Sequence, residues 1–124
     1  MCSVFEQDYS QIELLVFDGG STDHTLELLN KYSTLIAYSE CKPDRGQSHA
    51  INKGLQRMTG DIWMYLNSDD YLEEGCLQEV ARRFEDPNFS WLIGQTRVFD
   101  KDTVHGIREP RLPESKRDYL PYWG

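Results

Sequence analysis

Two adjacent aspartates, Asp69 and Asp70, are the residues of this sequence with the clearest chemical potential. They follow an apolar run at 62–66, with no basic residue close by in the sequence. Like charges at this spacing repel, so the pair favours a cationic ligand. Mg²⁺ and Mn²⁺ take oxygen ligands and are commonly held by one or two carboxylates plus substrate phosphates. The alternative interpretation is that Ser68, Asp69 and Asp70 only cap the turn into the following helix.

A third acid, Asp18, ends another apolar run, which starts at Ile12 and is followed by two glycines. This pattern is typical of a buried strand that leaves a sheet. Ligands of open α/β sheets bind at the carboxyl ends of the strands, so Asp18 and the Asp69–Asp70 pair could meet in one crevice. For Asp18 alone, a strand-end turn is the simpler interpretation. A phosphatase-like site is discounted, because Gly20 stands where its second acid is required.

The segments that must position these acids alternate between strand and helix patterns. Strands are predicted at 12–20, 34–40, 62–66 and 91–99, and helices at 21–32, 48–58 and 76–84. This alternation favours an α/β fold with a mostly parallel sheet and helices on its faces. After Lys101 the pattern ends. Residues 101–124 contain three of the five prolines and are predicted to be an extended loop or tail.

Composition restricts the class of protein. A chain of 124 residues is long enough for one small domain. Its 21 acidic and 13 basic residues give a net charge of -8, which argues against nucleic-acid binding and suits a protein that binds metal cations. Three cysteines without metal-ligand spacing are typical of free thiols in a reducing compartment. The longest apolar run is too short to span a bilayer, so we expect a cytoplasmic protein.

Three stretches together resemble the family 2 glycosyltransferases, which have the GT-A fold. They are FEQDYSQIELLVFDGGSTDHTLELLNKY at 5–32, PDRGQSHAINKGL at 43–55 and GDIWMYLNSDDYLEEGCL at 60–77. The resemblance runs from about Phe5 to Phe99. It implies a three-layer sandwich, with helices on both faces of a mostly parallel sheet, that is incomplete at both ends. Residues 1–100 would form the nucleotide-sugar-binding core.

The resemblance implies transfer of a sugar from a nucleotide-diphospho-sugar donor to a hydroxyl of a glycan or lipid-linked acceptor, usually with inversion. Asp70 matches the last acid of the family's Asp-x-Asp-like signature, which ligates Mn²⁺ or Mg²⁺, and Asp69 matches the acid that contacts the donor ribose or the metal. Relatives often build cell-envelope polysaccharides, so the resemblance also implies a location at the inner face of the membrane. The donor-binding residues implied by the resemblance are Asp18, Asp44, Arg45, Asn52, Lys53 and Asp69.

The sequence also departs from the family pattern. Gly19 stands where many relatives carry a second acid that binds the base, His49 stands where close relatives commonly have Asp, and His24 replaces a usual glycine. A partly exposed helix histidine is the simpler interpretation of His49, and a solvated helix face is the simpler interpretation of Lys53.

The resemblance is incomplete at both ends of the chain, and this leaves other interpretations of the function open. Relatives have an additional first strand in the middle of the sheet, and a later segment that supplies acceptor contacts and the general base. No general base is therefore assigned, since nothing singles out Asp100, Asp102 or Glu109. One alternative is a truncated, non-catalytic module that binds a nucleotide or metal, for example as a homodimer that covers an exposed sheet edge. Another is a structural α/β domain whose acids are only caps.

Overall fold

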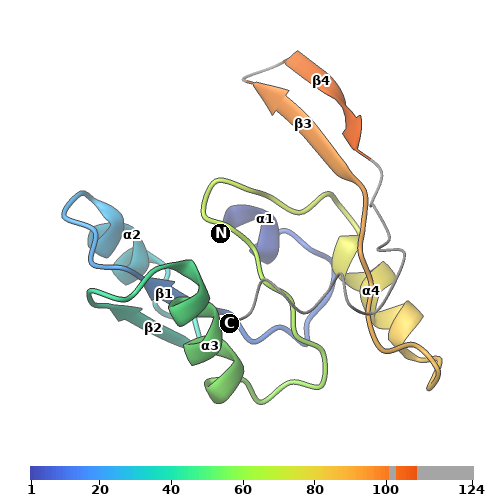
Figure 1. The fold of residues 1–124 in the computed structure, drawn as a ribbon, viewed down its shortest axis with the longest axis horizontal. Helices are drawn as coiled ribbons and strands as arrows, with labels where there is room; N and C mark the ends of the chain where they lie inside the picture. Colours follow the sequence, from blue (N-terminus) through green and yellow to red (C-terminus); the bar gives the residue numbers. More distant parts are fainter. Residues whose placement is uncertain (101–102, 109–124) are drawn as a thin grey trace. The chain divides into compact units, whose positions relative to one another are not determined.

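The computed structural model describes residues 1–100 and 103–108 of the chain. The chain divides into two compact units, one from Met1 to Asp86 and one that begins at Pro87. Within the described residues, the first unit contains a two-stranded parallel sheet with helices, and the second contains a two-stranded antiparallel sheet (Figure 1). None of the helices in the described ranges has the length and apolar character needed to cross a membrane.

The parallel sheet pairs β1 (Leu15–Asp18) with β2 (Tyr38–Cys41). Parallel neighbours need a crossover connection, and α2 (Thr25–Lys31) provides it. Both strands are shorter than the sequence predicted, because the ladder ends at each side. At one end the N–H of Ala37 donates to the carbonyl of Leu14, and at the other the N–H of Lys42 donates to that of Asp18. The predicted strand–helix–strand order is confirmed here.

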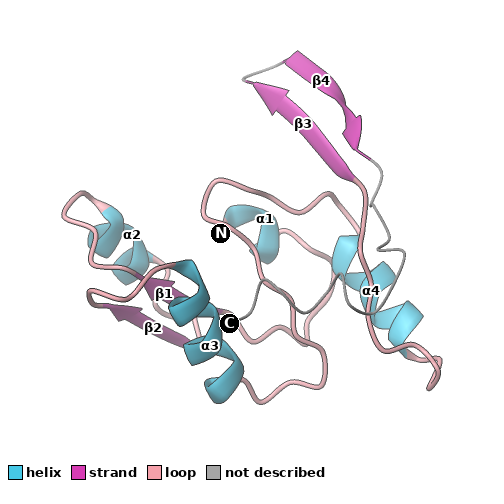
Figure 2. Cartoon of the chain, viewed as in Figure 1, coloured by secondary structure: helices cyan, strands magenta, loops and turns pink. Residues whose placement is uncertain are grey.

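Helix α3 (Gln47–Arg57) lies against this sheet (Figures 1 and 2). The helix packs on the sheet at Gly54, which is buried and where a Cβ would make ordinary contact with the Phe17 ring at 3.6 Å. The guanidinium of Arg57 lies 3.5 Å from the centroid of the Tyr38 ring. After the helix, the carboxylate of Glu13 accepts the Thr59 N–H over 2.7 Å. These contacts hold the C-terminal half of the helix against the sheet, and its N-terminal end continues the loop that follows β2.

Two more helices complete the first unit: α1 (Cys2–Phe5) and α4 (Cys76–Phe84). Helix α4 agrees with the helix predicted at 76–84. The Phe5 ring stacks on Tyr32 with centroids 5.8 Å apart. The buried apolar residues among the described residues are Val4, Leu29 and Ile36.

Gln7 is the buried polar residue that joins the chain start to the region before α4. It is 8% exposed. Its Nε2 donates to the carbonyls of Ser3 and Glu73, both at 3.0 Å, and its Oε1 accepts the N–H of Leu77 at 3.2 Å. The Ser3 hydroxyl accepts the N–H of Leu72 at 3.1 Å. These bonds anchor residues 72–77, the segment that directly follows the acid pair.

The prediction of a strand at 62–66 is wrong for this structure. The segment is a loop (Figure 2), and the side chains of Ile62, Trp63, Met64 and Tyr65 are 37–41% exposed. A strand requires a neighbour that supplies a ladder of hydrogen bonds. Within the described residues, the parallel sheet consists of β1 and β2, and the apolar run pairs with neither.

The second unit contains β3 (Thr96–Asp100) and β4 (Thr103–Arg108), which pair antiparallel with a bulge between Val98 and Phe99. The strand predicted at 91–99 thus begins later and extends to Asp100. The expectation of a loop or tail after Lys101 is wrong for β4. The local composition did not reveal this strand, because the strand depends on pairing with β3. The rest of that predicted tail lies outside the described residues. In total, the described residues form a mixed α/β structure with two short sheets, and the three-layer sandwich stays a prediction.

Candidate functional site

Asp18 is fixed by a turn at the carboxyl end of β1. Its half-buried carboxylate receives four hydrogen bonds: from the N–H of Gly20 (3.0 Å), from the N–H and hydroxyl of Ser21 (2.7 and 2.5 Å), and from the thiol of Cys41 (2.7 Å). Three of these reach Oδ2 and only the Ser21 hydroxyl reaches Oδ1. Cys41 is the residue opposite Asp18 in the sheet register. The side chain is therefore held in one orientation by both strands.

These bonds make Asp18 an unusually strong acid. The Cys41 thiol and then the Ser21 hydroxyl lower its pKa to about 2, against the smaller opposing effect of burial. In return, the Asp18 carboxylate raises the pKa of the Cys41 thiol, so this thiol keeps its proton and remains a donor. Asp18 is thus fully ionised at neutral pH.

The turn after Asp18 packs against the loop that follows β2. A Cβ on Gly19 would lie 3.5 Å from Oδ2 of Asp44, and one on Gly20 would lie 3.2 Å from the backbone nitrogen of Pro43. Gly20 also has a φ of +97°, a conformation that other residues rarely adopt. The structure therefore places Asp44 beside the turn that follows Asp18, at the carboxyl ends of the two parallel strands. The Asp44 carboxylate lies beside the space that a side chain at position 19 would enter.

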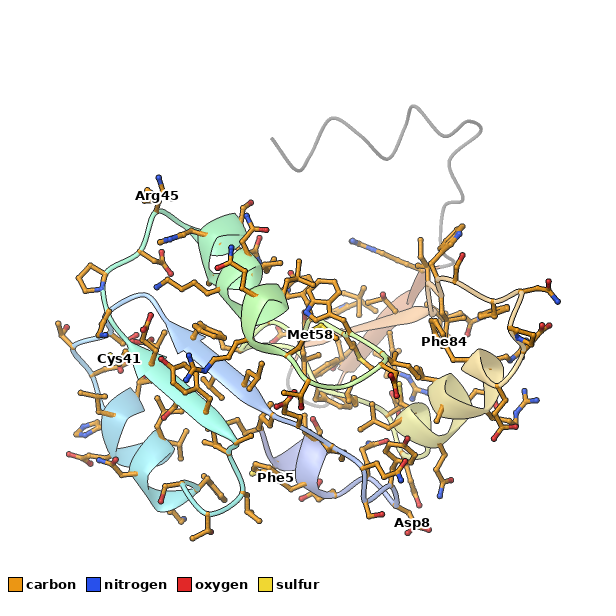
Figure 3. All side chains as sticks on the ribbon, turned by 90° about the horizontal axis from the view of Figure 1, so that it is seen from below. Phe5, Asp8, Cys41, Arg45, Met58 and Phe84 are labelled. Carbon is orange, nitrogen blue, oxygen red and sulfur yellow. The ribbon has the colours of Figure 1, made fainter. Side chains whose placement is uncertain are left out.

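Local hydrogen bonds also shape the loop that leads into α3. Oδ1 of Asp44 accepts the N–H of Gly46 at 2.7 Å, and Nδ1 of His49 accepts the N–H of Arg45 at 3.1 Å. His49 is therefore a structural acceptor with an unprotonated Nδ1 in this arrangement. Figure 3 shows Arg45 at the outer tip of the loop, where its side chain is exposed.

The acid pair lies in a turn formed by residues 67–70. The N–H of Asp70 donates to the carbonyl of Asn67 at 3.3 Å, and Nδ2 of Asn67 donates to Oδ2 of Asp70 at 2.8 Å. Asp69 and Asp70 are both exposed. The helix that follows, α4, begins after Gly75 with no side-chain cap, so neither acid caps it. The alternative interpretation is correct about the turn and wrong about a helix cap.

A polar cluster connects this turn to the start of α3. Nε2 of Gln47, the first residue of the helix, donates to Oδ1 of Asn67 at 2.8 Å and to the Tyr65 hydroxyl at 3.0 Å. The Tyr65 hydroxyl donates to the same Asn67 oxygen at 2.8 Å. The loop between β2 and α3 therefore contacts the Asp18 turn on one side and the acid turn, through Gln47, on the other.

The two remaining donor-binding candidates lie on α3. Asn52 is exposed. Lys53 is half-buried, and its Nζ lies 2.7 Å from Oε1 of Glu40 in β2. The Glu40 carboxylate also accepts the Tyr38 hydroxyl at 3.3 Å and lies 3.4 Å from Lys42, and its pKa is lowered chiefly by Lys53. Lys53 is thus part of an ion pair on the sheet instead of a solvated helix face.

Of the candidate general bases, only Asp100 lies within the described residues, as the exposed last residue of β3. Asp102 and Glu109 lie outside them. Sequence reasoning passed over four residues that organise the site: Ser21, Cys41, Gln47 and Asn67. Asn67 could have been found, because Asn is a common turn residue. Cys41 and Gln47 act through tertiary contacts that no local pattern reveals.

The fit of a divalent ion depends on the donors that the chain offers. Within the described ranges, no group of three or more His, Cys, Asp or Glu side chains could hold a metal ion. Two adjacent exposed carboxylates do fit Mg²⁺ or Mn²⁺ when substrate oxygens complete the coordination, which is the usual arrangement for these ions at phosphates. Asp69 and Asp70 therefore suit a shared metal site and do not suit an all-protein cage.

Comparison with known proteins adds an independent finding. The model of a protein family described as Glycosyl transferase family 2 matches residues 1–124. A poly-beta-1,6-N-acetyl-D-glucosamine synthase of Staphylococcus aureus is 24% identical over 109 residues, which cover 86% of this chain and 26% of the relative. The glycosyltransferase GlyA of Streptococcus pneumoniae is 28% identical over 102 residues, which cover 80% and 14%. The chain thus spans about a quarter or less of these curated relatives. No solved structure shows significant similarity to it.

Proposed function

We propose that this chain, which belongs to the family 2 glycosyltransferases, binds a nucleotide-diphospho-sugar donor and takes part in transfer of the sugar to an acceptor hydroxyl. The proposed reaction requires Mn²⁺ or Mg²⁺ and inverts the anomeric centre. Asp69 and Asp70 would hold the ion, and Asp18, Asp44, Arg45, Asn52 and Lys53 would contact the donor.

One observation carries the proposal: a single loop connects the acidic positions. Residues 42–46 meet the Asp18 turn through the contacts of Pro43 and Asp44 with the two glycines. The residue that follows, Gln47, reaches the acid turn through Asn67. A ligand that bridges these positions would have a nucleoside at one end and a diphosphate at the other. The Asp18 end of this proposed site lies at the carboxyl ends of the two parallel strands, where ligands of open α/β sheets bind.

The chain's own residues have distinct parts in this proposal. Asp18 stays ionised at neutral pH, and since Oδ2 already accepts three bonds, a nucleoside N–H or hydroxyl would use Oδ1. Arg45 offers an exposed guanidinium to the phosphates. Departure of the nucleoside diphosphate builds negative charge, which the divalent ion, when bound, stabilises as a Lewis acid.

Calorimetric titration with UDP, GDP and dTDP, each with and without Mn²⁺, tests the proposal. We expect one nucleotide to bind in a Mn²⁺-dependent way. Asp70→Ala should abolish the dependence, whereas Asp61→Ala, which removes an exposed acid earlier in the same loop, should retain it. Metal-independent binding, or equal affinities for the native protein and Asp70→Ala, would contradict the role of Asp70.

The acceptor is proposed from the relatives alone. One relative is named as a polysaccharide synthase, so we propose a glycan or lipid-linked acceptor and a location at the inner face of the membrane. Incorporation of radiolabel from the donor into a membrane fraction, compared with a soluble fraction, would test this. Donor binding with neither incorporation nor release of the sugar would favour the alternative, a module that binds a nucleotide or metal and transfers nothing.

A further inference from the structure

We propose that Gln47 and Asn67 are positioning residues, which orient the Asp70 carboxylate toward the metal ion and couple it to the loop at 42–46. The inference rests on the proposed function, because it takes Asp70 as the metal ligand. Neither residue contacts the donor in this proposal, and both act through Asp70.

The first part of the argument is the pair of bonds between Asn67 and Asp70. The side-chain amide donates to Oδ2 at 2.8 Å, and the backbone carbonyl of Asn67 accepts the N–H of Asp70 at 3.3 Å. The first bond restricts rotation of the carboxylate, and the second fixes the backbone that carries it. A carboxylate can accept about four hydrogen bonds, so one side-chain bond orients it and leaves capacity for a cation.

The second part is that the orientation of the Asn67 amide is itself determined. Its Oδ1 faces two donors at 2.8 Å, the Gln47 amide and the Tyr65 hydroxyl. Because the oxygen is fixed on that side, the NH₂ group must face Asp70. Replacement of Gln47 would remove one of the two donors that keep the Asn67 amide in this orientation.

The third part is the chemical identity of residue 67. An ionised acid at this position would place a third carboxylate next to Asp69 and Asp70. One of its oxygens would face Oδ2 of Asp70 and repel it, because neither group carries a proton to donate. An amide supplies the donor without added charge. Partners that orient metal-ligating carboxylates typically contribute a factor of about 10 to 100 to metal affinity.

The fourth part concerns coupling. Gln47 directly follows the loop whose Asp44 meets the turn after Asp18. A displacement of this loop would move Gln47, and through Asn67 the Asp70 carboxylate. Contact with a nucleoside at one end of the site would therefore bias the metal ligand at the other end.

The test measures Mn²⁺ affinity from the free-ion EPR signal, in the presence of whichever of UDP, GDP or dTDP the native protein binds. We expect Asn67→Ala to weaken Mn²⁺ binding by about tenfold or more, with a smaller loss for Gln47→Ala. The double variant should be no weaker than Asn67→Ala alone, because Gln47 acts through Asn67. Gln56→Ala on the same helix and Asn30→Ala on α2 are exposed controls that should match the native protein.

Two further readouts separate positioning from stability. Calorimetric nucleotide affinity without metal and the melting temperature should stay near the native values in Gln47→Ala, and if Asn67→Ala does not fold, Gln47→Ala decides. The inference would be overturned by unchanged Mn²⁺ affinity in the variants or by additive losses of Mn²⁺ affinity in the double variant. It would also be overturned by a loss of nucleotide affinity that is equal with and without metal. If Asp70→Ala bound nucleotide with the same Mn²⁺ dependence as the native protein, the proposed function itself would be overturned, since that comparison does not involve Gln47 or Asn67.

Discussion

The thiol of Cys41 donates a hydrogen bond to Oδ2 of Asp18 over 2.7 Å and joins the last residues of the two parallel strands. Register makes this contact possible, because the two residues lie opposite each other in the ladder. It gives a lone cysteine a definite role as a neutral donor. It also means that the acid at the strand end depends on the neighbouring strand as well as on its own turn.

Cys41→Ala should therefore weaken the fold in a pH-dependent way. The folded pKa of Asp18, about 2, lies below its ordinary value of 3.8, so its contribution to stability is present above pH 4 and is lost as the pH falls toward 2. Removal of the thiol raises the folded pKa and should cost about 1 kcal/mol at pH 7. Urea unfolding at pH 7, 4 and 2.5 should show the difference shrink with acid. Cys41→Ser keeps a donor and should recover most of the loss, whereas equal stability of all three proteins would contradict the assignment.

Gly20→Ala should be much more harmful than Gly19→Ala. At Gly20 the backbone φ is +97°, and a Cβ would lie 3.2 Å from Pro43. Such strain typically costs about 1–3 kcal/mol. A Cβ on Gly19 would make ordinary contacts at 3.5 Å with Asp44. Thermal unfolding of the two variants measures the contrast, and similar melting temperatures would argue against this packing of the two turns.

Gln7→Ala should destabilise the first unit, because the side chain is buried and serves three backbone groups. Loss of these bonds leaves polar groups without partners and should cost about 1–3 kcal/mol in urea unfolding. Gln11→Ala, at an exposed position, is the matched control and should be close to neutral. Hydrogen exchange at the N–H of Leu77 should accelerate in Gln7→Ala. Native protection there would show that Gln7 does not anchor this segment.

Lys53→Met should raise the pKa of Glu40, because Lys53 is the main cause of its lowered value. A lowered carboxylate pKa stabilises the fold above the ordinary pKa of 4.5, and this effect is lost as the pH falls through the folded value. The variant should therefore be less stable than the native protein at neutral pH, and the difference should shrink in acid. An NMR titration of the Glu40 carboxyl carbon measures the shift. Lys42→Met removes the more distant and more exposed partner and should have a smaller effect. Donor titration of Lys53→Met would test separately whether this residue also binds the nucleotide-sugar.

Local patterns were sufficient for a definite part of this structure. The helical spacing at 76–84 predicted α4, which depends on residues close together in the sequence. The apolar run that ends at Asp18 predicted β1, and its partner β2 was predicted as well. General strand geometry predicted that Asp18 and the Asp69–Asp70 pair lie at strand ends, and of these acids only Asp18 ends a strand in the structure.

The failures share a physical cause. The run at 62–66 is as apolar as a buried strand, yet a strand exists only where another strand supplies hydrogen bonds, and composition does not encode that partner. The same reason applies to β4, which pairs with β3 although its residues are exposed. Gln7 and Gln47 resemble ordinary polar residues in the sequence. Their roles depend on contacts with residues 66 and 18 positions further along, respectively.

The contact of Gln47 with Tyr65 and Asn67 has a consequence for protein engineering. Residues 42–47 and 65–70 are separate in the sequence but are joined by side-chain hydrogen bonds. A chimera whose first segment lacks Gln47 would leave the Tyr65 hydroxyl as the remaining donor to Oδ1 of Asn67. The two segments therefore form one structural unit, and designs that exchange one of them should exchange the other with it.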